Sequence, residues 1–289
     1  MMEGREKLIP YKRKIVYAFS FPFQKFKETI MRIAITFHFQ NQELSIFYRY
    51  HLQGLIFGYL RSSHKVLAAL LHNIGFPYNG RARFKFFCFS GLVFETPLKL
   101  PKGREHFWIR NMTAKLYISS AMDDFIKHLL FGLFKKGEFI RIGRSKGRVL
   151  EVAVLEPIQA ESEMVLKPVF SPIVMKLYKR NEKGRLFLES DDKEFGIKLK
   201  ENLIKKYEIF YQEPPENKHL DFEFLEHRTA PVPIKKKLED GSWYRGESIG
   251  NIGKFRVKGS RELIQMGLDC GFGSQNSMGC GFCDVVKME

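Results

Sequence analysis

Two periods of hydrophobic and polar positions run along the first half of the chain, and they predict strands and helices in turn. The stretch 31–39, MRIAITFHF, is β-branched and aromatic with Arg32 and Thr36 at alternate positions, which is typical of a strand. Between residues 47 and 62, apolar residues recur at the spacing of one helix face, which predicts a helix. The same two patterns predict further helices at 65–74 and 122–137, and strands at 83–95, 114–120, 138–143 and 148–157.

The second half of the chain repeats these signals more loosely. They predict strands at 170–178, 184–190, 219–227 and 281–287, strand segments around turns at 235–260, and helices at 194–211 and 260–271. The first half thus follows the β-α-β-β-α-β order of a ferredoxin-like (RRM-like) domain, with the first helix split in two, and the second half repeats this order more loosely. The predicted fold class is therefore α+β with two such domains in tandem. We expect an N-terminal extension at 1–30, an N-terminal domain at 31–157 and a C-terminal domain at 164–289, with the break near the acidic stretch EPIQAESE.

The charge balance narrows the class of partner. The chain has 48 Lys and Arg against 32 Asp and Glu, a net charge of +16, which favours a polyanion. Nucleic acid is the first choice, an anionic membrane surface the second, and a solvated lysine-rich surface the alternative without a partner. No apolar run is long enough to span a membrane and no secretory signal is evident, so we expect a cytoplasmic protein with reduced cysteines.

A glycine-rich segment lies near the C-terminus, at 270–285, CGFGSQNSMGCGFCDV. Its glycines do not form a dinucleotide-binding fingerprint or a P-loop, because they stand between a predicted helix and a predicted strand and no Gly-Lys-Ser/Thr follows. Glycines allow close approach of the backbone and expose N–H groups to phosphate oxygens. The segment therefore predicts either a loop that approaches a ligand or a plain flexible loop. Its candidate binding residues are Gly271, Gly273, Ser274, Gln275, Asn276, Gly279 and Gly281.

The cysteines of the same segment suggest metal or redox chemistry, but their context disfavours both. Cys280 and Cys283 have the C-x-x-C spacing, yet no second such pair or His-x₃₋₅-His follows to complete a zinc site. A thioredoxin-type pair opens a helix, whereas this one enters a strand. We expect no metal and no cofactor.

Four stretches in order along the chain resemble one known family. GFGSQNSMGCGF resembles the C-terminal signature of the CRISPR repeat-RNA processing endoribonucleases of the RAMP superfamily. YHLQGLIFGYLRSSHKVLAALLH (50–72), RFKFFCFS (83–90) and VFSPIVMK (169–176) are similar to three further motifs of that family, and the resemblance runs from Met31 to the end. It implies two tandem ferredoxin-like domains and cleavage of CRISPR precursor RNA within the repeat, without metal, leaving a 2′,3′-cyclic phosphate.

The resemblance also implies which residues cleave RNA. His72 matches the family's "LH" histidine and lies off the apolar stripe of its predicted helix, so it is the candidate general base. Lys85 matches the lysine of the "K-x-F-x-[FY]-S" pattern and would stabilise charge on the phosphate, with Arg81 and Arg83 close by. Phe57 departs from the family, which has a tyrosine there. Tyr59, Tyr78, His72 or water would then have to protonate the leaving group.

Basic residues concentrate before the glycine-rich segment. We expect these side chains to bind RNA; the alternative is a solvated charged face without a partner. They include Lys235, Lys236, Lys237, Arg245 and Arg256. The first expected partner is CRISPR repeat RNA, and the second is a set of subunits of a CRISPR effector complex. The alternative functions are a non-catalytic repeat-RNA-binding subunit of such a complex and a general RNA-binding module.

Overall fold

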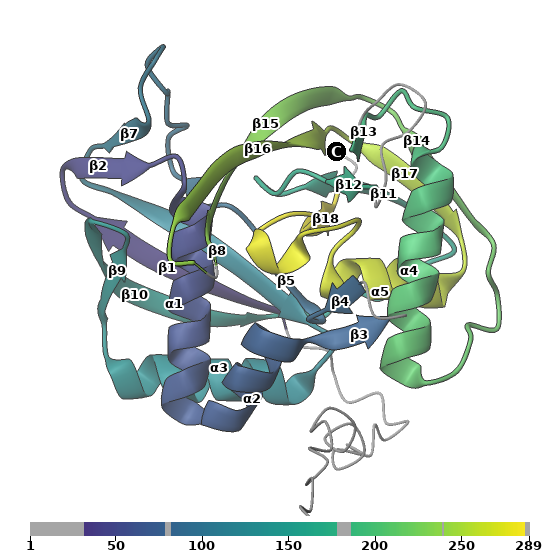
Figure 1. The fold of residues 1–289 in the computed structure, drawn as a ribbon, viewed down its shortest axis with the longest axis horizontal. Coiled ribbons are helices and arrows are strands. Elements are labelled where there is room, and N and C mark those ends of the chain that lie inside the picture. The colour runs from purple at the N-terminus through teal and green to yellow at the C-terminus, as the bar shows by residue number, and fades with distance from the viewer. Residues whose placement is uncertain (1–31, 79–81, 178–185, 239, 287–289) are drawn as a thin grey trace, which may run out of the picture.

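A computed structural model describes residues 32–78, 82–177, 186–238 and 240–286 of the chain. Its first half forms an antiparallel sheet in the order β5 (Phe87–Phe89), β8 (Met112–Ser120), β1 (Arg32–Phe39), β10 (Ser145–Leu155) and β9 (Phe139–Ile142), and β6 (Val93–Phe94) also pairs with β8. Helices α1 (Tyr48–Ser63) and α3 (Asp123–Lys136) pack against this sheet (Figure 1). Without the edge strand β9, the order is that of a ferredoxin-like domain, as predicted.

The N-terminal core forms because one side of β1 is apolar at every second residue. Ile33, Ile35 and Phe37 are almost fully buried and share a cluster with residues of both helices, such as Leu52 and Leu129. The two helices cross closely at Gly132, where an added Cβ would lie 1.9 Å from the Tyr59 carbonyl oxygen.

The second half forms a four-stranded antiparallel sheet in the order β14 (Leu220–Phe224), β17 (Phe255–Gly259), β11 (Glu163–Pro168) and β18 (Cys283–Val285). Helices α4 (Phe195–Tyr211) and α5 (Arg261–Cys270) share its core. Numbered along the chain, the strands of this sheet lie side by side in the order second, third, first and fourth. This is again the strand order of a ferredoxin-like domain. The Ser260 hydroxyl caps α5 by accepting a hydrogen bond from the Leu263 amide at 3.3 Å, as its sequence position suggests.

One predicted strand of the second half is wrong. The first strand of the C-terminal sheet is β11, not 170–178. Within the described residues 170–177, only Met175–Lys176 form a short strand, β12, which pairs with β13 (Phe187–Leu188). Ile173 and Val174 are fully buried but make single bridges, to Asn251 and Ser274. Their apolar character reflects burial beneath other segments rather than membership of the sheet.

The predicted strand 83–95 is also interrupted. It divides into β4 (Ala82–Phe84), which pairs with β3 (Phe76–Tyr78), and then β5 and β6. The break lies at Phe86, whose φ of 50° is in the left-handed region. This turn carries the Phe86 ring into the C-terminal core, 5.0 Å from the ring of Phe210.

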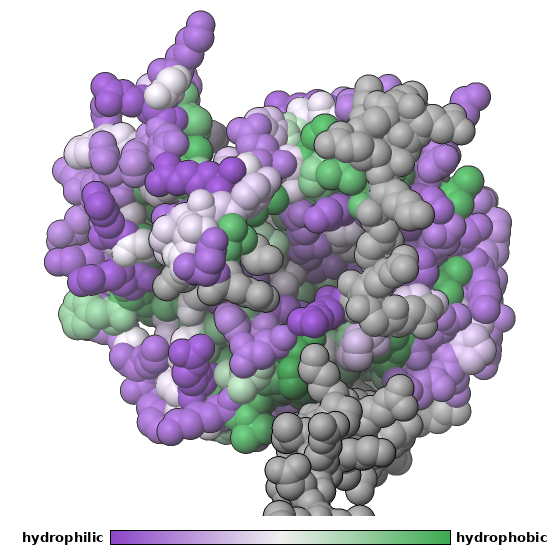
Figure 2. Space-filling model, viewed as in Figure 1, coloured by the Kyte–Doolittle hydropathy of each residue, from purple (hydrophilic) through white to green (hydrophobic). Residues whose placement is uncertain are grey.

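A long two-stranded ribbon spans the two halves. It consists of β15 (Arg228–Lys237) and β16 (Trp243–Ile252), and Figure 1 shows it arching over the molecule toward α1. Figure 2 shows a hydrophilic surface over most of this face, including a hollow at its centre. A shorter pair, β2 (Gln42–Ser45) and β7 (His106–Ile109), extends from the N-terminal half.

Candidate functional site

His72 lies in a wide turn at the end of a broken helix. After α1, the His64 ring caps α2 (Lys65–Ala69) by accepting a hydrogen bond from the Leu67 amide at 3.1 Å. The chain then continues as a π-helical turn, η1 (Leu70–Ile74), a rare conformation that is frequent at functional sites. Leu71 is buried in the core, whereas His72 is exposed, as predicted from the apolar stripe.

Lys85 is held beside His72 by side-chain hydrogen bonds from its own segment to backbone carbonyl groups of the η1 turn. Its Nζ donates to the His72 carbonyl oxygen at 3.3 Å, and Arg83 Nη1 donates to the Asn73 carbonyl oxygen at 3.2 Å. Gly75, with φ of 62°, permits this approach, since an added Cβ would lie 2.9 Å from the Phe84 carbonyl oxygen. Three of the four residues predicted for cleavage or its support therefore meet; Arg81 lies outside the described residues.

Phe57 contacts both candidate catalytic residues, His72 and Lys85. Its ring is buried and meets the His72 ring edge to face, with centroids 5.0 Å apart. The Lys85 ammonium stands 5.1 Å from the centre of the same ring, within range of a cation–π attraction. The position where the family has tyrosine thus touches both residues, and phenylalanine leaves it without a hydroxyl group.

The surroundings set the protonation of this site. Burial, and then the neighbouring Arg83, lower the pKa of Lys85, so its ammonium releases a proton more readily than an exposed lysine does. His72 Nδ1 lies 2.8 Å from the Asn73 Oδ1, which accepts hydrogen bonds but cannot donate them. This contact favours the tautomer with the proton on Nδ1, which leaves Nε2 as the basic nitrogen.

A cavity of about 330 Å³ opens beside His72, and it adds two cations that the sequence analysis did not single out. It is lined by Arg61, Lys65, Ala69, His72 and Asn73. Arg61 and Lys65 resemble ordinary solvated helix residues in the sequence. Only the turn between α1 and α2 shows that they face the same space as His72.

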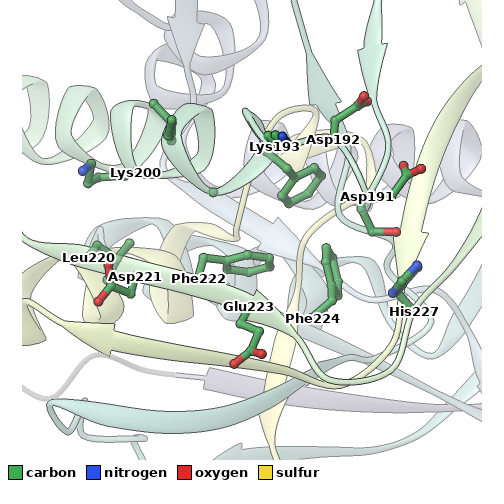
Figure 3. Close-up of a pocket in the computed structure, with 14 residues that line it drawn as sticks. Asp191, Asp192, Lys193, Lys200, Leu220, Asp221, Phe222, Glu223, Phe224 and His227 are labelled. Atoms are coloured by element: carbon green, nitrogen blue, oxygen red, sulfur yellow. The ribbon is translucent and has the colours of Figure 1, made fainter.

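A second cavity, of about 470 Å³, has a different character. It lies in the C-terminal half between the first turn of α4 and β14. Figure 3 shows the rings of Phe222 and Phe224 pointing into it, with His227 near Asp191 at one end. Four carboxylates line it, which disfavours a polyanion, and it contains none of the predicted site residues.

The glycine-rich loop, residues 271–281, lies between the two halves rather than at the surface. Its four glycines all have positive φ and are buried. The Gly271, Gly279 and Gly281 amides already donate to protein carbonyl groups, so these N–H groups are not available for phosphate. Ser274, Gln275 and Asn276 are half-buried; Gln275 hydrogen-bonds Ser248 of the ribbon, with Nε2 2.9 Å from the Ser248 Oγ.

Side chains of α1 hold this loop against the N-terminal half. Gln53 Nε2 donates to the Ser277 carbonyl oxygen at 2.6 Å, and Arg49 Nε donates to the Gly279 carbonyl oxygen at 3.3 Å. In addition, Arg32 Nη2 donates to the Cys283 carbonyl oxygen at 2.9 Å, just after the loop. The loop therefore joins the two domains through its backbone.

The cysteines are separated and protonated. Cys280 packs with Val174 and Val232, whereas Cys283 belongs to the C-terminal core. Burial raises the pKa of Cys280 to about 11, and it raises that of Cys283 well above the ordinary value. In the described part of the chain, no three His, Cys, Asp or Glu side chains converge as a metal site requires.

The basic residues predicted to grip RNA occupy two different settings. Lys235 Nζ stands 4.5 Å from the Trp243 ring, which itself meets the Tyr50 ring of α1 at 5.6 Å. Arg245, also on the ribbon, lies 3.4 Å from the Glu105 carboxylate. Arg256 instead lies on the C-terminal sheet, within 3.5 Å of two carboxylates. The side chains of Lys236 and Lys237 lie outside the description.

The fold groups this protein with proteins of two tandem ferredoxin-like units. A solved structure of an RAMP protein has the same fold: it matches with a TM-score of 0.70 at 23% identity and covers 89% of this chain and 100% of that one. Family models described as CRISPR-associated protein Cas6, N-terminal, and CRISPR associated protein Cas6, C-terminal, match residues 43–153 and 154–285. The chain belongs to the Cas6 family.

Individual relatives agree with this assignment. The chain is 32% identical over 244 residues to CRISPR-associated endoribonuclease Cas6 1 of Methanocaldococcus jannaschii, covering 84% of this chain and 86% of that protein. It is 27% identical over 246 residues to CRISPR-associated endoribonuclease Cas6 of Pyrococcus furiosus, covering 84% and 82%. A solved structure of a Cas6-related protein from Pyrococcus furiosus matches with a TM-score of 0.73 at 21% identity, covering 90% of this chain and 100% of that one, which supports the fold. Among the described residues, none of the helices has the length and apolarity needed to cross a membrane.

Proposed function

We propose that this chain is an endoribonuclease that cuts CRISPR precursor RNA within the repeat, without metal, and leaves a 2′,3′-cyclic phosphate. One observation carries the proposal: His72 and Lys85, from separate segments, meet above Phe57 at the surface. Two relatives of the same family are named as endoribonucleases, which supports the same activity. The net charge of +16 suits an RNA partner.

His72 acts as the general base in this proposal. Its Nε2 takes the proton from the 2′-hydroxyl on the upstream side of the cut, and the 2′-oxygen then forms a bond to the adjacent phosphorus while the bond to the 5′-oxygen breaks. Asn73 holds the ring in the tautomer that this step requires, because its Oδ1 accepts the Nδ1 proton. DNA has no 2′-hydroxyl and is therefore not a substrate.

Lys85 acts on the opposite side of the reacting phosphate. Its ammonium offsets the charge that develops on the non-bridging oxygens, and its lowered pKa suits it to protonate the leaving 5′-oxygen. Phe57 has no proton to give. Tyr59 is also excluded as the acid, since it is 2% exposed and burial raises its pKa to about 12.

The proposed RNA path includes cations on both sides of His72. Arg61 and Lys65 would hold the nucleotide that enters their cavity, and Arg83 would neutralise a phosphate beside Lys85. Farther along, the ribbon and the half-buried polar side chains of the glycine-rich loop, Ser274, Gln275 and Asn276, would hold the rest of the repeat. Effector-complex subunits would take the product, in the cytoplasm.

The test uses purified protein and a repeat RNA from its own CRISPR array. Cleavage should proceed in EDTA, stop when the nucleotide upstream of the cut is 2′-deoxy, and yield a cyclic phosphate end. Tight binding without cleavage would instead favour a non-catalytic RNA-binding subunit. This alternative is tested because Phe57 lacks the hydroxyl group of the family's tyrosine. Cleavage lost in EDTA and restored by a divalent cation would overturn the metal-free mechanism.

A further inference from the structure

The ribbon carries an exposed tryptophan where it meets α1 (Figure 1). Trp243, the first residue of β16, is 48% exposed. Its ring meets the Tyr50 ring of α1 edge to face, with centroids 5.6 Å apart and planes at 86°. Tyr50 in turn meets the ring of its neighbour His51 at 5.3 Å. These contacts hold the indole ring in place, while nearly half of it stays open to solvent.

Two cations lie on the same face of the ribbon as Trp243. Lys235 and Arg245 are opposite each other in the ladder, and Arg245 follows Trp243 by two residues, so all three side chains point to one side. Lys235 Nζ stands 4.5 Å from the centre of the Trp243 ring, and the Arg245 guanidinium carbon is 5.6 Å from the centre of the Phe47 ring just before α1. Burial, and then the charge of Lys235, lower the pKa of His51 on α1, so the positive potential of this face reaches the helix.

The ribbon as a whole is basic. Its two strands contain five basic residues and one acidic residue, namely Arg228, Lys235, Lys236, Lys237 and Arg245 against Glu247. Arg245 pairs with the Glu105 carboxylate at 3.4 Å, but the two side chains are 57% and 53% exposed. An exposed ion pair of this kind stabilises little, so Arg245 can exchange Glu105 for a phosphate group.

An exposed aromatic ring beside two cations matches the chemistry of single-stranded RNA. Each unpaired nucleotide offers a flat base that stacks on an aromatic ring and a phosphate that a cation binds. Double-stranded RNA offers phosphates, sugar hydroxyl groups and base edges but no free base face, because its bases are already stacked in the helix. A protein partner would suit the tryptophan, yet lysine is depleted at protein–protein interfaces. The surface therefore fits unpaired RNA best.

We propose that Trp243, Lys235 and Arg245 form a binding site for an unpaired nucleotide of RNA. The base stacks on the open part of the Trp243 ring, and Lys235 and Arg245 bind the phosphates on either side of it. The identity of this RNA as the CRISPR repeat rests on the proposed function, whereas the stacking site itself does not. The part of the repeat on the ribbon is therefore single-stranded when bound.

The first experiment uses tryptophan fluorescence, because the chain contains two tryptophans, Trp108 and Trp243. Trp108, on β7, is 53% exposed and serves as the matched control. In Trp108→Phe, repeat RNA should quench the emission of Trp243, since a base stacked on indole quenches it. In Trp243→Phe, the same RNA should leave the emission of Trp108 almost unchanged. No quenching of Trp243, or equal quenching of both, would overturn the proposal.

Substitutions of Trp243 separate stacking from packing. Trp243→Ala and Trp243→Leu should raise the Kd for repeat RNA by about 5- to 150-fold, the contribution of one stacked base, whereas Trp243→Phe keeps an aromatic face and should lose less. The slope of log affinity against log salt concentration should not change in these variants, since stacking releases no counterions. Trp108→Ala should bind as wild type. Wild-type affinity in Trp243→Leu would assign Trp243 to packing alone, and a reduced salt slope in Trp243→Leu would mean that Trp243 acts only through Lys235.

The role of Arg245 is tested by a substitution that leaves the site intact. Glu105→Gln removes the carboxylate that pairs with Arg245 and should lower the Kd for repeat RNA by up to about fivefold at low salt. Glu138→Gln is the matched control, because it removes the partner of Arg148 from an equally exposed ion pair and changes the net charge by the same amount. If the two variants bound RNA equally well, Arg245 would have no part in the site.

The stacking site and the proposed function fail separately. Quenching of Trp243 by unpaired RNA in a protein that cleaves no repeat would support the site and contradict the proposed function, and cleavage without quenching would do the reverse. Repeat RNA annealed to its complementary strand should not quench Trp243; quenching by this duplex would refute a single-stranded ligand. If RNA left Trp243 unquenched and an effector-complex subunit shielded it from acrylamide, the occupant would be a protein instead.

Discussion

The crossing of α1 and α3 allows a quantitative prediction, because Gly132 lies at the contact of the two helices and Gly54, also in a helix, lies away from it. Gly132 lies where the helix backbones touch: an added Cβ would be 1.9 Å from the Tyr59 carbonyl oxygen and 2.9 Å from the Ser62 Oγ. Gly54, exposed on α1, has no atom within 4 Å of an added Cβ. Both are helical, so Gly→Ala brings the same gain in helix propensity, about 1 kcal/mol.

The free energies of unfolding should therefore shift in opposite directions. Ordinary C···O contacts begin near about 3.3 Å, so Gly132→Ala requires the backbones to separate by more than 1 Å. Overpacking of this kind costs typically about 1–3 kcal/mol, and a backbone oxygen places this site at or above the upper end. After the gain in propensity, we expect a net loss of about 2 kcal/mol for Gly132→Ala and a gain of up to about 1 kcal/mol for Gly54→Ala.

Urea and thermal denaturation measure the difference. For a chain of this size, 1 kcal/mol corresponds to about 2–4 °C in Tm, so the two variants should differ by about 6–12 °C. Effects on the unfolded chain are common to both substitutions and cancel in the comparison. If Gly132→Ala were as stable as Gly54→Ala, the close approach of α1 and α3 would be wrong.

Three further predictions concern the site. His72→Ala should slow single-turnover cleavage by about 10²–10⁴-fold with little effect on RNA binding. His227→Ala, which changes a histidine in the acidic cavity, is the control and should cleave RNA at the wild-type rate. Equal cleavage rates for the two variants would remove His72 from the mechanism. Lys235→Ala should reduce the slope of log affinity against log salt concentration by about 0.7. Arg256→Ala should reduce this slope by less, because two carboxylates already pair with Arg256. A larger reduction for Arg256→Ala than for Lys235→Ala would place the RNA on the C-terminal sheet. Phe57→Tyr should accelerate cleavage if proton donation to the leaving group limits the rate, and an unchanged rate would leave that donation to Lys85.

Several features of this protein were evident in its sequence because they depend on neighbours along the chain. The apolar stripe of α3 reports which side of that helix is buried, and the β-branched and aromatic run of β1 marks a strand, although the structure buries both of its sides. The exposed position of His72 followed from the same periodicity. Its pairing with Lys85 came instead from family resemblance, since no local pattern connects residues 13 positions apart.

The tertiary structure decided what depends on contacts between distant segments. Ile173 and Val174 look like a strand because they are apolar, yet other segments bury them without a ladder. Arg61 and Lys65 face the His72 cavity only because the chain turns between α1 and α2. Lys206 reads as one more lysine in a basic helix. It becomes a buried, fully hydrogen-bonded ammonium because a loop 65 residues later folds its carbonyl groups around it, and the periodicity of a helix carries no information about such a partner.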